Sequence, residues 1–314
     1  MALRSKGTVR DVLGRVGGVV LKKFVCDSHG LTLPATLAIL TISKRFEAAD
    51  LPPTEEDLVN RIFITGSTRG IGAETARQLI DLGHEVVVHA RNPAREREAK
   101  AQFPDAHGIV AGELDSLLAT SALAAKADAF GPYDVIIHNA GIGGGVAERA
   151  QTADGFERIF HTNVIAPYML TALMSLPRRM VFLTSGLEAN GTWSPEDLQW
   201  TTRPWKGMKA YSDSKLHDLM LALEVAARYP QVISNAVDPG WIKTDMGGPN
   251  APDPVALGAE TQVWLATSED ADAKASGRYL KRRQVLDPNP VALDATARTN
   301  LVDELVRLSG VRLP

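Results

Sequence analysis

Short apolar runs, several of them rich in β-branched residues, alternate with longer stretches of helical periodicity from Asn60 to the end of the chain. Runs of this length predict buried strands, and the periodic stretches between them predict helices. The predicted strands span 61–65, 85–90, 107–114, 133–138, 179–185, 231–237 and 277–280. The first predicted helix ends at Leu82, and the others span 93–102, 116–130, 207–229 and 293–308.

This alternation of strand and helix is typical of an α/β domain whose mostly parallel sheet is covered on both faces. Right-handed crossovers then give a single doubly wound, Rossmann-type domain with a seven-stranded sheet, which we place at 59–314. Sheets of this kind bind ligands at the carboxyl ends of their strands. The functional residues are therefore expected just after the predicted strands.

Residues 1–58 stand outside this pattern. Residues 1–23 mix basic side chains with Val, Leu and Gly, which is compatible with an amphipathic helix or a transit-like segment. Pro52, Pro53 and the acidic residues 55–57 resemble a linker, and the predicted fold needs nothing before Arg61. We interpret 1–58 as an N-terminal extension, poorly ordered or an artefact of the gene model, with translation starting at Val59 as one hypothesis.

Composition excludes several classes of function. The 314 residues are 45% hydrophobic and 23% charged, as in ordinary soluble domains, and a net charge of −3 does not favour binding to nucleic acid. A single cysteine, Cys26, rules out an internal disulfide and fits a reducing, cytoplasmic location. No zinc-ligand spacing is present, and no apolar run is long enough to span a bilayer. A small molecule is therefore the expected partner.

A glycine-rich turn, TGSTRGIG at 65–72, follows the first predicted strand directly. Glycines permit a tight turn and close backbone approach to a pyrophosphate, and the helix that they open directs free N–H groups at the phosphates. Between a first strand and a first helix, this turn indicates a dinucleotide site. The predicted cofactor contacts in it are Gly66, Ser67, Thr68, Arg69, Gly70, Ile71 and Gly72.

The end of the second predicted strand bears on which dinucleotide binds. NAD sites usually place a carboxylate there to accept hydrogen bonds from the ribose hydroxyls. This chain instead has His89, Ala90, Arg91 and Asn92. Arg91, together with Arg69 in the glycine turn, is suited to pair with a 2′-phosphate. The pattern favours NADP(H), and NAD(H) remains an alternative.

A proton-transfer pair is predicted in the helix after the fifth strand, where Tyr211 and Lys215 are four residues apart and share one face. A phenol titrates near 10 in water, and a neighbouring ammonium lowers that pKa toward the working range of an acid/base. The spacing alone is weak evidence, but its surroundings strengthen it. Ser185 ends the fifth predicted strand, where its hydroxyl can hold a carbonyl group or merely cap the next turn. Asn163 lies in the preceding helix, where its amide can anchor the lysine or make a local hydrogen bond.

The fourth predicted strand is followed by Asn139, Ala140 and Gly141, a small-residue turn that lets a cofactor lie close to the backbone. With TGSTRGIG, Asn163, Ser185, YSDSK at 211–215 and PGWIKT at 239–244, this turn makes the chain resemble the short-chain dehydrogenase/reductase superfamily over 60–311. Its ordinary-length branch, with retinol-dehydrogenase-like and WW-domain-oxidoreductase-like members, is the most similar.

The resemblance implies an NAD(P)(H)-dependent oxidoreductase that moves a hydride between nicotinamide and a carbonyl or alcohol substrate. It implies that Tyr211 is the acid/base and that Lys215 lowers the pKa of Tyr211 and binds the nicotinamide ribose. Ser185 would orient the carbonyl, and Asn163 would support a proton relay. The residues implied on the nicotinamide side are Pro239, Gly240 and Thr244.

Two departures from the family pattern affect what can be carried over. The usual acidic residue before Leu in the turn after the third strand, which the family places near adenine, appears here as Glu113 before Leu114, so the adenine contact does not carry over directly. The helix after Asn163 is short and ends before Pro177, and since this helix often forms dimer contacts in the superfamily, monomer and homo-oligomer both stay open.

The substrate region is predicted in the insert 186–209 and after the PGWIKT motif. Trp193, Trp200, Trp205 and Trp241 can bind an apolar carbonyl substrate or simply pack the insert onto the domain. The segment 246–249 is suited to close over a substrate. Two rival functions remain: a non-catalytic NADP(H)-binding sensor or scaffold, and an epimerase or dehydratase that uses the same pair.

Overall fold

The computed structural model describes residues 14–16, 19–21 and 59–314. The chain divides into two units, residues 1–54 and residues 55–314. In the first unit, strands β1 (Gly14–Val16) and β2 (Val19–Leu21) pair in antiparallel orientation. The rest of 1–58 lies outside the described residues, so its interpretation as an extension to the fold stays a prediction.

The second unit is built on one sheet of eight strands, in the order β10-β9-β8-β7-β6-β3-β4-β5. Its strands from β3 to β9 are parallel, and β10 pairs with β9 in antiparallel orientation. The bounds are β3 (Arg61–Ile64), β4 (Glu85–Ala90), β5 (Gly108–Ala111), β6 (Val135–His138), β7 (Arg179–Leu183), β8 (Ile233–Val237), β9 (Tyr279–Lys281) and β10 (Gln284–Val285). The predicted doubly wound α/β class is confirmed.

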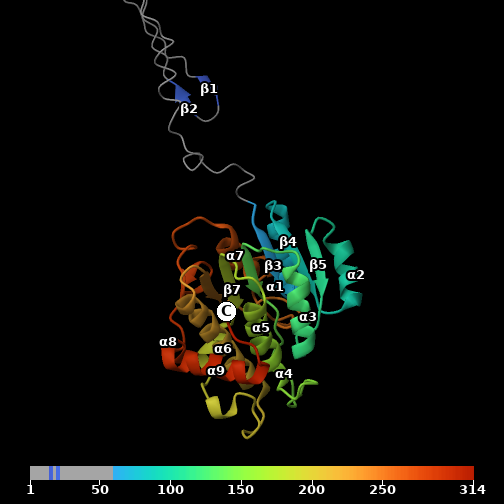
Figure 1. Cartoon of the computed structure of the whole chain (residues 1–314), viewed down its shortest axis with the longest axis vertical. Helices are drawn as coiled ribbons and strands as arrows, with labels where there is room; N and C mark the ends of the chain where they lie inside the picture. The colour runs from blue at the N-terminus through green and yellow to red at the C-terminus, as the bar shows by residue number, and fades with distance from the viewer. Residues whose placement is uncertain (1–13, 17–18, 22–58) are drawn as a thin grey trace, which may run out of the picture. The chain divides into compact units, whose positions relative to one another are not determined.

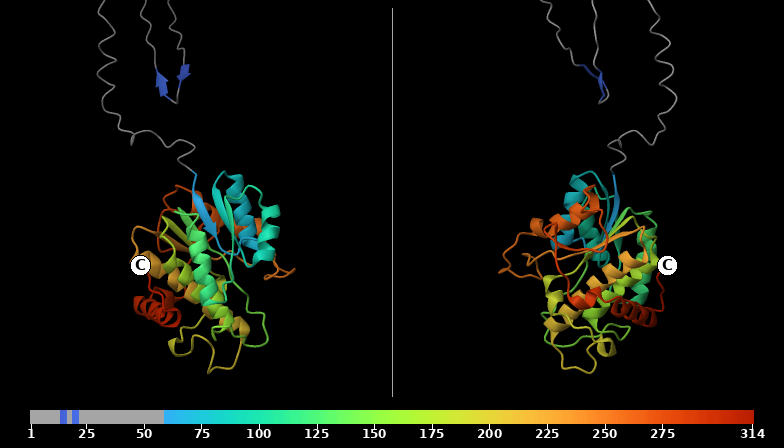
Figure 2. Two further views of the ribbon diagram at one scale, coloured as in Figure 1. Left: turned by 45° about the vertical axis from the view of Figure 1, so that its right-hand side comes forward. Right: turned by 90° about the vertical axis from the view of Figure 1, so that its left-hand side faces the viewer.

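Helices cover both faces of this sheet (Figures 1 and 2). One face carries α1 (Gly70–Asp81), α2 (Pro93–Gln102) and α7 (Val255–Thr267). The other carries α3 (Leu117–Asp128), α5 (Ala166–Leu173) and α6 (Gly207–Arg228), with α9 (Ala295–Ser309) packed on α6. Short turns complete the set: α4 (Arg158–Phe160), the π-turn η3 (His161–Ile165), η4 (Gly186–Asn190), η5 (Pro195–Asp197) and α8 (Pro290–Leu293).

Strand β3 shows why the central strands are apolar without interruption. Ile62 and Ile64 pack into the cluster under α1 and α7, whereas Phe63 packs into the cluster under α3 and α5. Successive side chains of a strand point to opposite faces, so a strand buried on both faces must be apolar at every position. Burial on both faces is therefore the reason why short, continuous apolar runs predicted the strands in this part of the chain.

Strand β10 and helix α7 are the two elements in contact with the main sheet or its helices that the sequence analysis did not predict, besides the short turns η4, η5 and α8. Strand β10 is two residues long, too short for a hydrophobic period. Helix α7 is buried along most of its length, so its apolar residues do not form one face. The predicted helix 293–308 begins later, at Ala295, because the Asp294 side chain accepts hydrogen bonds from the N–H groups of Thr296 and Ala297 and caps the helix there.

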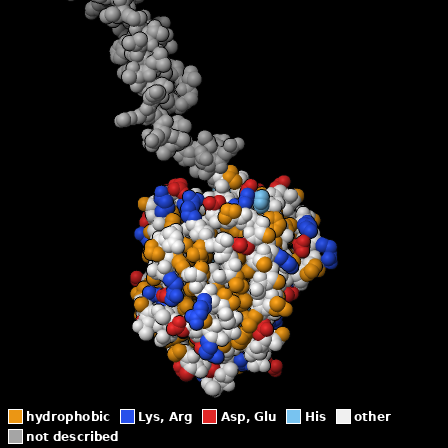
Figure 3. Space-filling view, in the orientation of Figure 1, with side chains coloured by type: hydrophobic (Ala, Val, Ile, Leu, Met, Phe, Trp, Pro, Cys, Tyr) orange, Lys and Arg blue, Asp and Glu red, His pale blue; other side chains and the backbone are white. Residues whose placement is uncertain are grey.

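The strand order places a topological switch point between β3 and β6. From β3 the chain moves outward to β4 and β5, and from β6 it moves the other way to β7 and β8. Loops diverge at such a point and leave a crevice at the carboxyl ends of the strands. Figure 3 shows acidic, basic and apolar side chains intermixed on one face of the domain. No helix in the described part of the chain is long and apolar enough to cross a membrane.

Candidate active site

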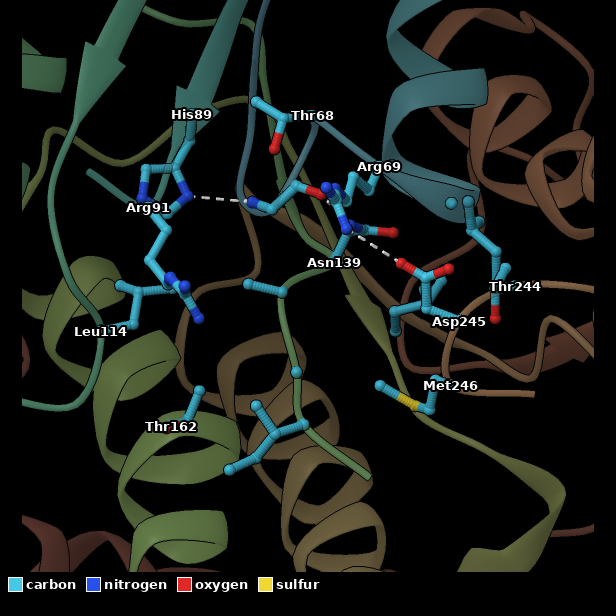
Figure 4. Close-up of a pocket in the computed structure, with 18 of the residues that line it drawn as sticks. Thr68, Arg69, His89, Arg91, Leu114, Asn139, Thr162, Thr244, Asp245 and Met246 are labelled. Atoms are coloured by element: carbon cyan, nitrogen blue, oxygen red, sulfur yellow. Dashed lines mark hydrogen bonds and ion pairs between the residues drawn. The ribbon is translucent and has the colours of Figure 1, made fainter. Parts of the chain in front are cut away.

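Two adjoining cavities open at the carboxyl edge of the sheet. The first, of about 370 Å³, lies at the switch point and is lined by the glycine turn and by the residues at the ends of β4 and β6 (Figure 4). The second, of about 610 Å³, lies beside it, between the loop after β6 and the loop after β8. Tyr211, Thr184, Pro239, Thr244, Ile71 and Met246 line both. Two molecules, one in each cavity, would therefore meet at the boundary that these six residues form, with Tyr211 among them.

The glycine turn packs directly on the turn after β6. Gly66 has a φ of +65°, and a Cβ atom there would lie 2.9 Å from Ala140 Cα. The Thr65 hydroxyl oxygen accepts hydrogen bonds from the N–H groups of Asn139 and Ala140, each at 3.0 Å. The Asn139 side chain in turn donates to the Thr65 carbonyl at 2.8 Å. Only a glycine at position 66 allows this approach, which shapes the floor of the first cavity.

Helix α1 opens from this turn toward the first cavity. Its N-cap residue, Arg69, makes no side-chain capping bond, so its side chain leaves the first N–H groups of α1 available to a ligand. Gly70, with a φ of +53°, lies against Thr244: a Cβ atom there would be 3.1 Å from Thr244 Cγ2. The predicted residues 66–72 are thus gathered around one cavity, except Ser67, which is fully buried and donates to the Ile64 carbonyl.

His89, which the sequence analysis mentioned only as a non-acidic residue, supports the glycine turn from β4. Its Nδ1 accepts the Gly66 N–H at 2.9 Å, so its Nε2 carries the proton and donates to the Gly112 carbonyl at 2.8 Å. Burial lowers the pKa of His89 to about 4, against a smaller opposing effect of the bond to Gly112. The ring is therefore neutral near pH 7. No local sequence signal indicates this role, because β3 and β4 meet only in the folded sheet.

The two predicted phosphate-binding arginines both line the first cavity (Figure 4). Arg91 is mostly exposed, with its Nε 4.0 Å from a carboxylate oxygen of Glu113. Arg69 Nη1 lies 3.2 Å from Asp245 Oδ2, in an exposed ion pair that joins the glycine turn to the loop after β8. Of the two arginines, Arg91 is thus the one less closely paired with a carboxylate.

Tyr211 and Lys215 lie on one face of α6, with the Lys215 Nζ 5.9 Å from the centre of the Tyr211 ring. Lys215 is almost fully buried, and its Nζ donates to the Leu183 carbonyl at 2.8 Å and to Asp218 Oδ2 at 2.7 Å. Burial by itself lowers the pKa of Lys215, but attraction to Asp218 and Tyr211 and the bond to Asp218 together raise it. Asp218 was not among the predicted site residues, although its i, i+3 spacing from Lys215 is visible in the sequence.

Asn163 occupies the middle of the π-turn η3, next to Lys215. Its Oδ1 accepts the Ile142 N–H at 2.8 Å, and its Nδ2 donates to the Ile142 carbonyl and to Ser214 Oγ. A Cβ atom on Gly141 would lie 3.3 Å from Asn163 Oδ1 and 3.5 Å from Lys215 Nζ. The amide thus holds the loop after β6 against α6.

Ser185 lies two residues beyond the end of β7 and faces the second cavity together with Tyr211. Its Oγ accepts the Leu187 N–H at 3.2 Å and caps the short turn η4. Because this bond uses only a lone pair, the hydroxyl proton stays free to donate into the cavity. Capping and carbonyl binding are therefore compatible at this residue.

Apolar side chains ring the second cavity. Met208, Trp241 and Met246 line it and are each more than half exposed. The three tryptophans of the insert pack instead: Trp200 and Trp205 against one another, and Trp193 against the core. One polar feature was missed, an ion pair of 2.8 Å between Asp238 and Lys281 in the wall. Within the described residues, no His, Cys, Asp or Glu group is arranged to hold a metal ion.

Comparison with known proteins identifies the family of this chain. The family model described as short chain dehydrogenase matches residues 60–191. Short-chain dehydrogenase chyC of Penicillium rubens is 37% identical over 258 residues, which cover 81% of this chain and 99% of the relative. The chain belongs to the short-chain dehydrogenase/reductase family. Mouse retinol dehydrogenase 14 is 30% identical, with 77% of this chain and 83% of the relative covered.

Solved structures show the same fold. An uncharacterized protein from Mycobacterium paratuberculosis has a TM-score of 0.71 and 27% identity, with 84% of this chain and 100% of that chain covered. A short chain dehydrogenase from Burkholderia cenocepacia, solved in complex with NADP, has a TM-score of 0.55 and 21% identity, with 71% and 96% covered. Membership in this family makes the chain an oxidoreductase of the short-chain dehydrogenase/reductase class.

Proposed function

We propose that this short-chain dehydrogenase/reductase interconverts a carbonyl and an alcohol, with NADP(H) in the first cavity and the substrate in the second. One observation carries the proposal: Tyr211 lines both cavities, and Lys215 lies behind it on the same helix face. A proton donor at the boundary between two binding sites is what a coupled transfer of hydride and proton requires. The bound nicotinamide supplies or accepts the hydride.

The first cavity fits a dinucleotide. A Cβ atom at Gly66 would press on Ala140, so only a glycine is accommodated there, and its backbone borders the cavity without a side chain. The first N–H groups of α1 face the same space, with a positive helix end behind them. Pro239 and Thr244, from the loop after β8, line both cavities and border the end of the first where the nicotinamide would lie, whereas Gly240 lines only the second.

Each polar side chain then has a distinct task. In the direction of reduction, the Tyr211 hydroxyl gives its proton to the carbonyl oxygen, and in oxidation it takes that proton back. Lys215 favours the resulting phenolate by its charge. The Ser185 hydroxyl donates to the carbonyl oxygen and orients it, since its bond with Leu187 uses a lone pair and leaves the proton free. Asn163 fixes the loop between cofactor and α6.

The arginines support NADP(H) over NAD(H). Both line the first cavity, and a guanidinium pairs well with a phosphate. The Burkholderia structure with NADP supports the same assignment. Arg91 is the better candidate, because its Nε lies 4.0 Å from the Glu113 carboxylate, whereas Arg69 makes a closer ion pair of 3.2 Å with Asp245.

We expect Arg91→Ala to weaken NADPH binding by roughly 10- to 100-fold, the usual size of a lost charge-assisted hydrogen bond. NADH lacks the 2′-phosphate, so its dissociation constant should change little. Titration of both cofactors by fluorescence measures the difference. Arg97→Ala, an exposed arginine on α2 outside the cavity, is the control. Equal losses for the two cofactors would contradict the assignment.

The rim of the second cavity favours a bulky apolar ketone or aldehyde. Met208, Trp241 and Met246 offer exposed apolar surface around a cavity of about 610 Å³. Such surface binds apolar molecules that extend beyond the cavity. Retinoid, steroid, lipid aldehyde and aromatic ketone carbonyls all belong to this class.

A screen of carbonyls of increasing apolar size, with NADPH and NADH and followed by nicotinamide absorbance, tests the proposed function. We expect kcat/KM to rise with apolar size and to be higher with NADPH. The corresponding alcohols should react in reverse with NADP. Absence of turnover with every member of the series would instead support a cofactor-binding protein without catalysis.

A further inference from the structure

Two opposite charges are buried together in α6, directly behind the proposed proton donor. Lys215 and Asp218 each expose only 4% of their surface, and Lys215 Nζ lies 2.7 Å from Asp218 Oδ2. A buried ion pair adds little net stability, because taking both charges out of water offsets their attraction. A pair that contributes little to stability but borders a site calls for a functional explanation.

The hydrogen-bond donors of the Lys215 ammonium provide such an explanation. An ammonium has three N–H groups and no acceptor. The Leu183 carbonyl takes one of them and Asp218 takes a second. One N–H remains, and Lys215 lines the first cavity. Two anchors from different directions, β7 and α6, leave the third N–H with a fixed direction.

We propose that Asp218 is a positioning residue that keeps the Lys215 amine protonated inside the fold and directs its third N–H into the cofactor cavity. The inference rests on the proposed function, since it assigns Lys215 a ligand in that cavity. Asp218 itself is buried and does not line either cavity. It acts through Lys215 and not on the reacting atoms.

The surroundings of Lys215 show why the carboxylate matters. The groups that face Lys215 are the Asp218 carboxylate and the Tyr211 ring from α6, the Leu183 carbonyl from β7 and the Asn163 amide from η3. Asp218 is the only carboxyl group among them. Burial raises the pKa of Asp218 to about 6 against the lowering effect of Lys215, so the carboxylate is ionised above that pH. Without it, burial would leave Lys215 tending to lose its proton.

The test is NADPH affinity as a function of pH for the full chain and for Asp218→Asn, which keeps the side-chain shape and removes the charge. In the parent protein we expect the affinity to change little between about pH 6.5 and about pH 9. In the variant it should fall by about tenfold or more by about pH 9 and recover on acidification, as expected for loss of a charged hydrogen bond. A flat profile in Asp218→Asn would overturn the proposal.

Asp213→Asn is the matched control. Asp213 is a buried acid on the same helix, but it pairs with Arg203 and Lys209. It should give no pH-dependent loss of affinity, and a loss equal to that of Asp218→Asn would mean that any buried charge on α6 matters. That result would also overturn the proposal.

A double-mutant cycle covers the case in which Asp218→Asn folds poorly. Lys215→Met leaves Asp218 without its partner, and adding Asp218→Asn removes the stranded carboxylate. The double variant should melt at a higher temperature than Lys215→Met and bind NADPH equally well. A further loss of affinity would show that Asp218 acts independently of Lys215 and would overturn the proposal. Because cofactor affinity needs no substrate, failure here is distinct from a failed carbonyl screen.

Discussion

Tyr211→Phe is expected to abolish turnover while leaving cofactor binding nearly intact. The change removes only the hydroxyl, so the ring keeps its packing between the two cavities. A positioned general acid/base contributes about 10²- to 10⁴-fold to a rate, and we expect kcat to fall by at least that lower bound. Steady-state kinetics with the best substrate of the screen, together with NADPH titration, measure the two effects.

Tyr133→Phe is the matched control for this change. The Tyr133 hydroxyl donates to the Ala127 carbonyl at 2.5 Å and lies outside both cavities. Its loss should lower stability without removing activity. If Tyr211→Phe retained turnover within about tenfold of the parent, a proton donor at Tyr211 would be wrong, because general acid/base catalysis is worth more than that.

The second large effect is unfolding in mild acid, driven by buried histidines. Burial lowers the pKa of His89 to about 4, and the pKa values of His138 and His217 to about 3. In the unfolded chain the same groups titrate near 6.5. Below about pH 6.5 the unfolded state therefore binds more protons, so folded stability falls as the pH drops toward 4 and then 3.

The magnitude is large for a single domain. The shift of His89 alone corresponds to roughly 3 kcal/mol, since each pKa unit is worth about 1.4 kcal/mol. Asp218 works in the opposite sense, because its pKa is raised to about 6 and protonation favours the folded state. Burial also raises the pKa values of Glu157 and Glu188, in the same sense as that of Asp218, so these three carboxyls offset part of the loss from the three histidines. Total stability is typically about 5–15 kcal/mol, so we expect cooperative unfolding between about pH 6 and about pH 4.

Urea unfolding at a series of pH values, followed by circular dichroism, measures this loss. His217→Leu is an informative variant, because neither ring nitrogen of His217 has a hydrogen-bond partner among the described residues. The imidazole packs against the rings of Phe160 and Trp193, which an apolar side chain can also contact. The variant should lose less stability on acidification than the parent. An unchanged slope of unfolding free energy against pH would contradict the role given to buried histidines.

The local patterns of the chain predicted much of the fold. Uninterrupted apolar runs at β3, β4 and β6 predicted strands buried on both faces, and the periodicity of α6 predicted a helix of nearly the observed length. The glycine turn could be located because residues such as Gly66 occupy backbone conformations that other residues rarely adopt. Patterns of this kind depend on near neighbours, which the sequence shows directly. Strand β10 and helix α7 lack such a pattern and were missed.

The tertiary structure decided which distant residues meet. The order of strands places Asn139 beside the glycine turn and His89 beneath Gly66, contacts between residues far apart in the chain. It also set the partners of Lys215, since the Leu183 carbonyl comes from β7 across the sheet. The sequence by itself determined the residue types of the Tyr211 and Lys215 pair and their common helix face. Tertiary packing decided the protonation state of Lys215, because the charge of this buried amine depends on the Asp218 carboxylate that is buried beside it.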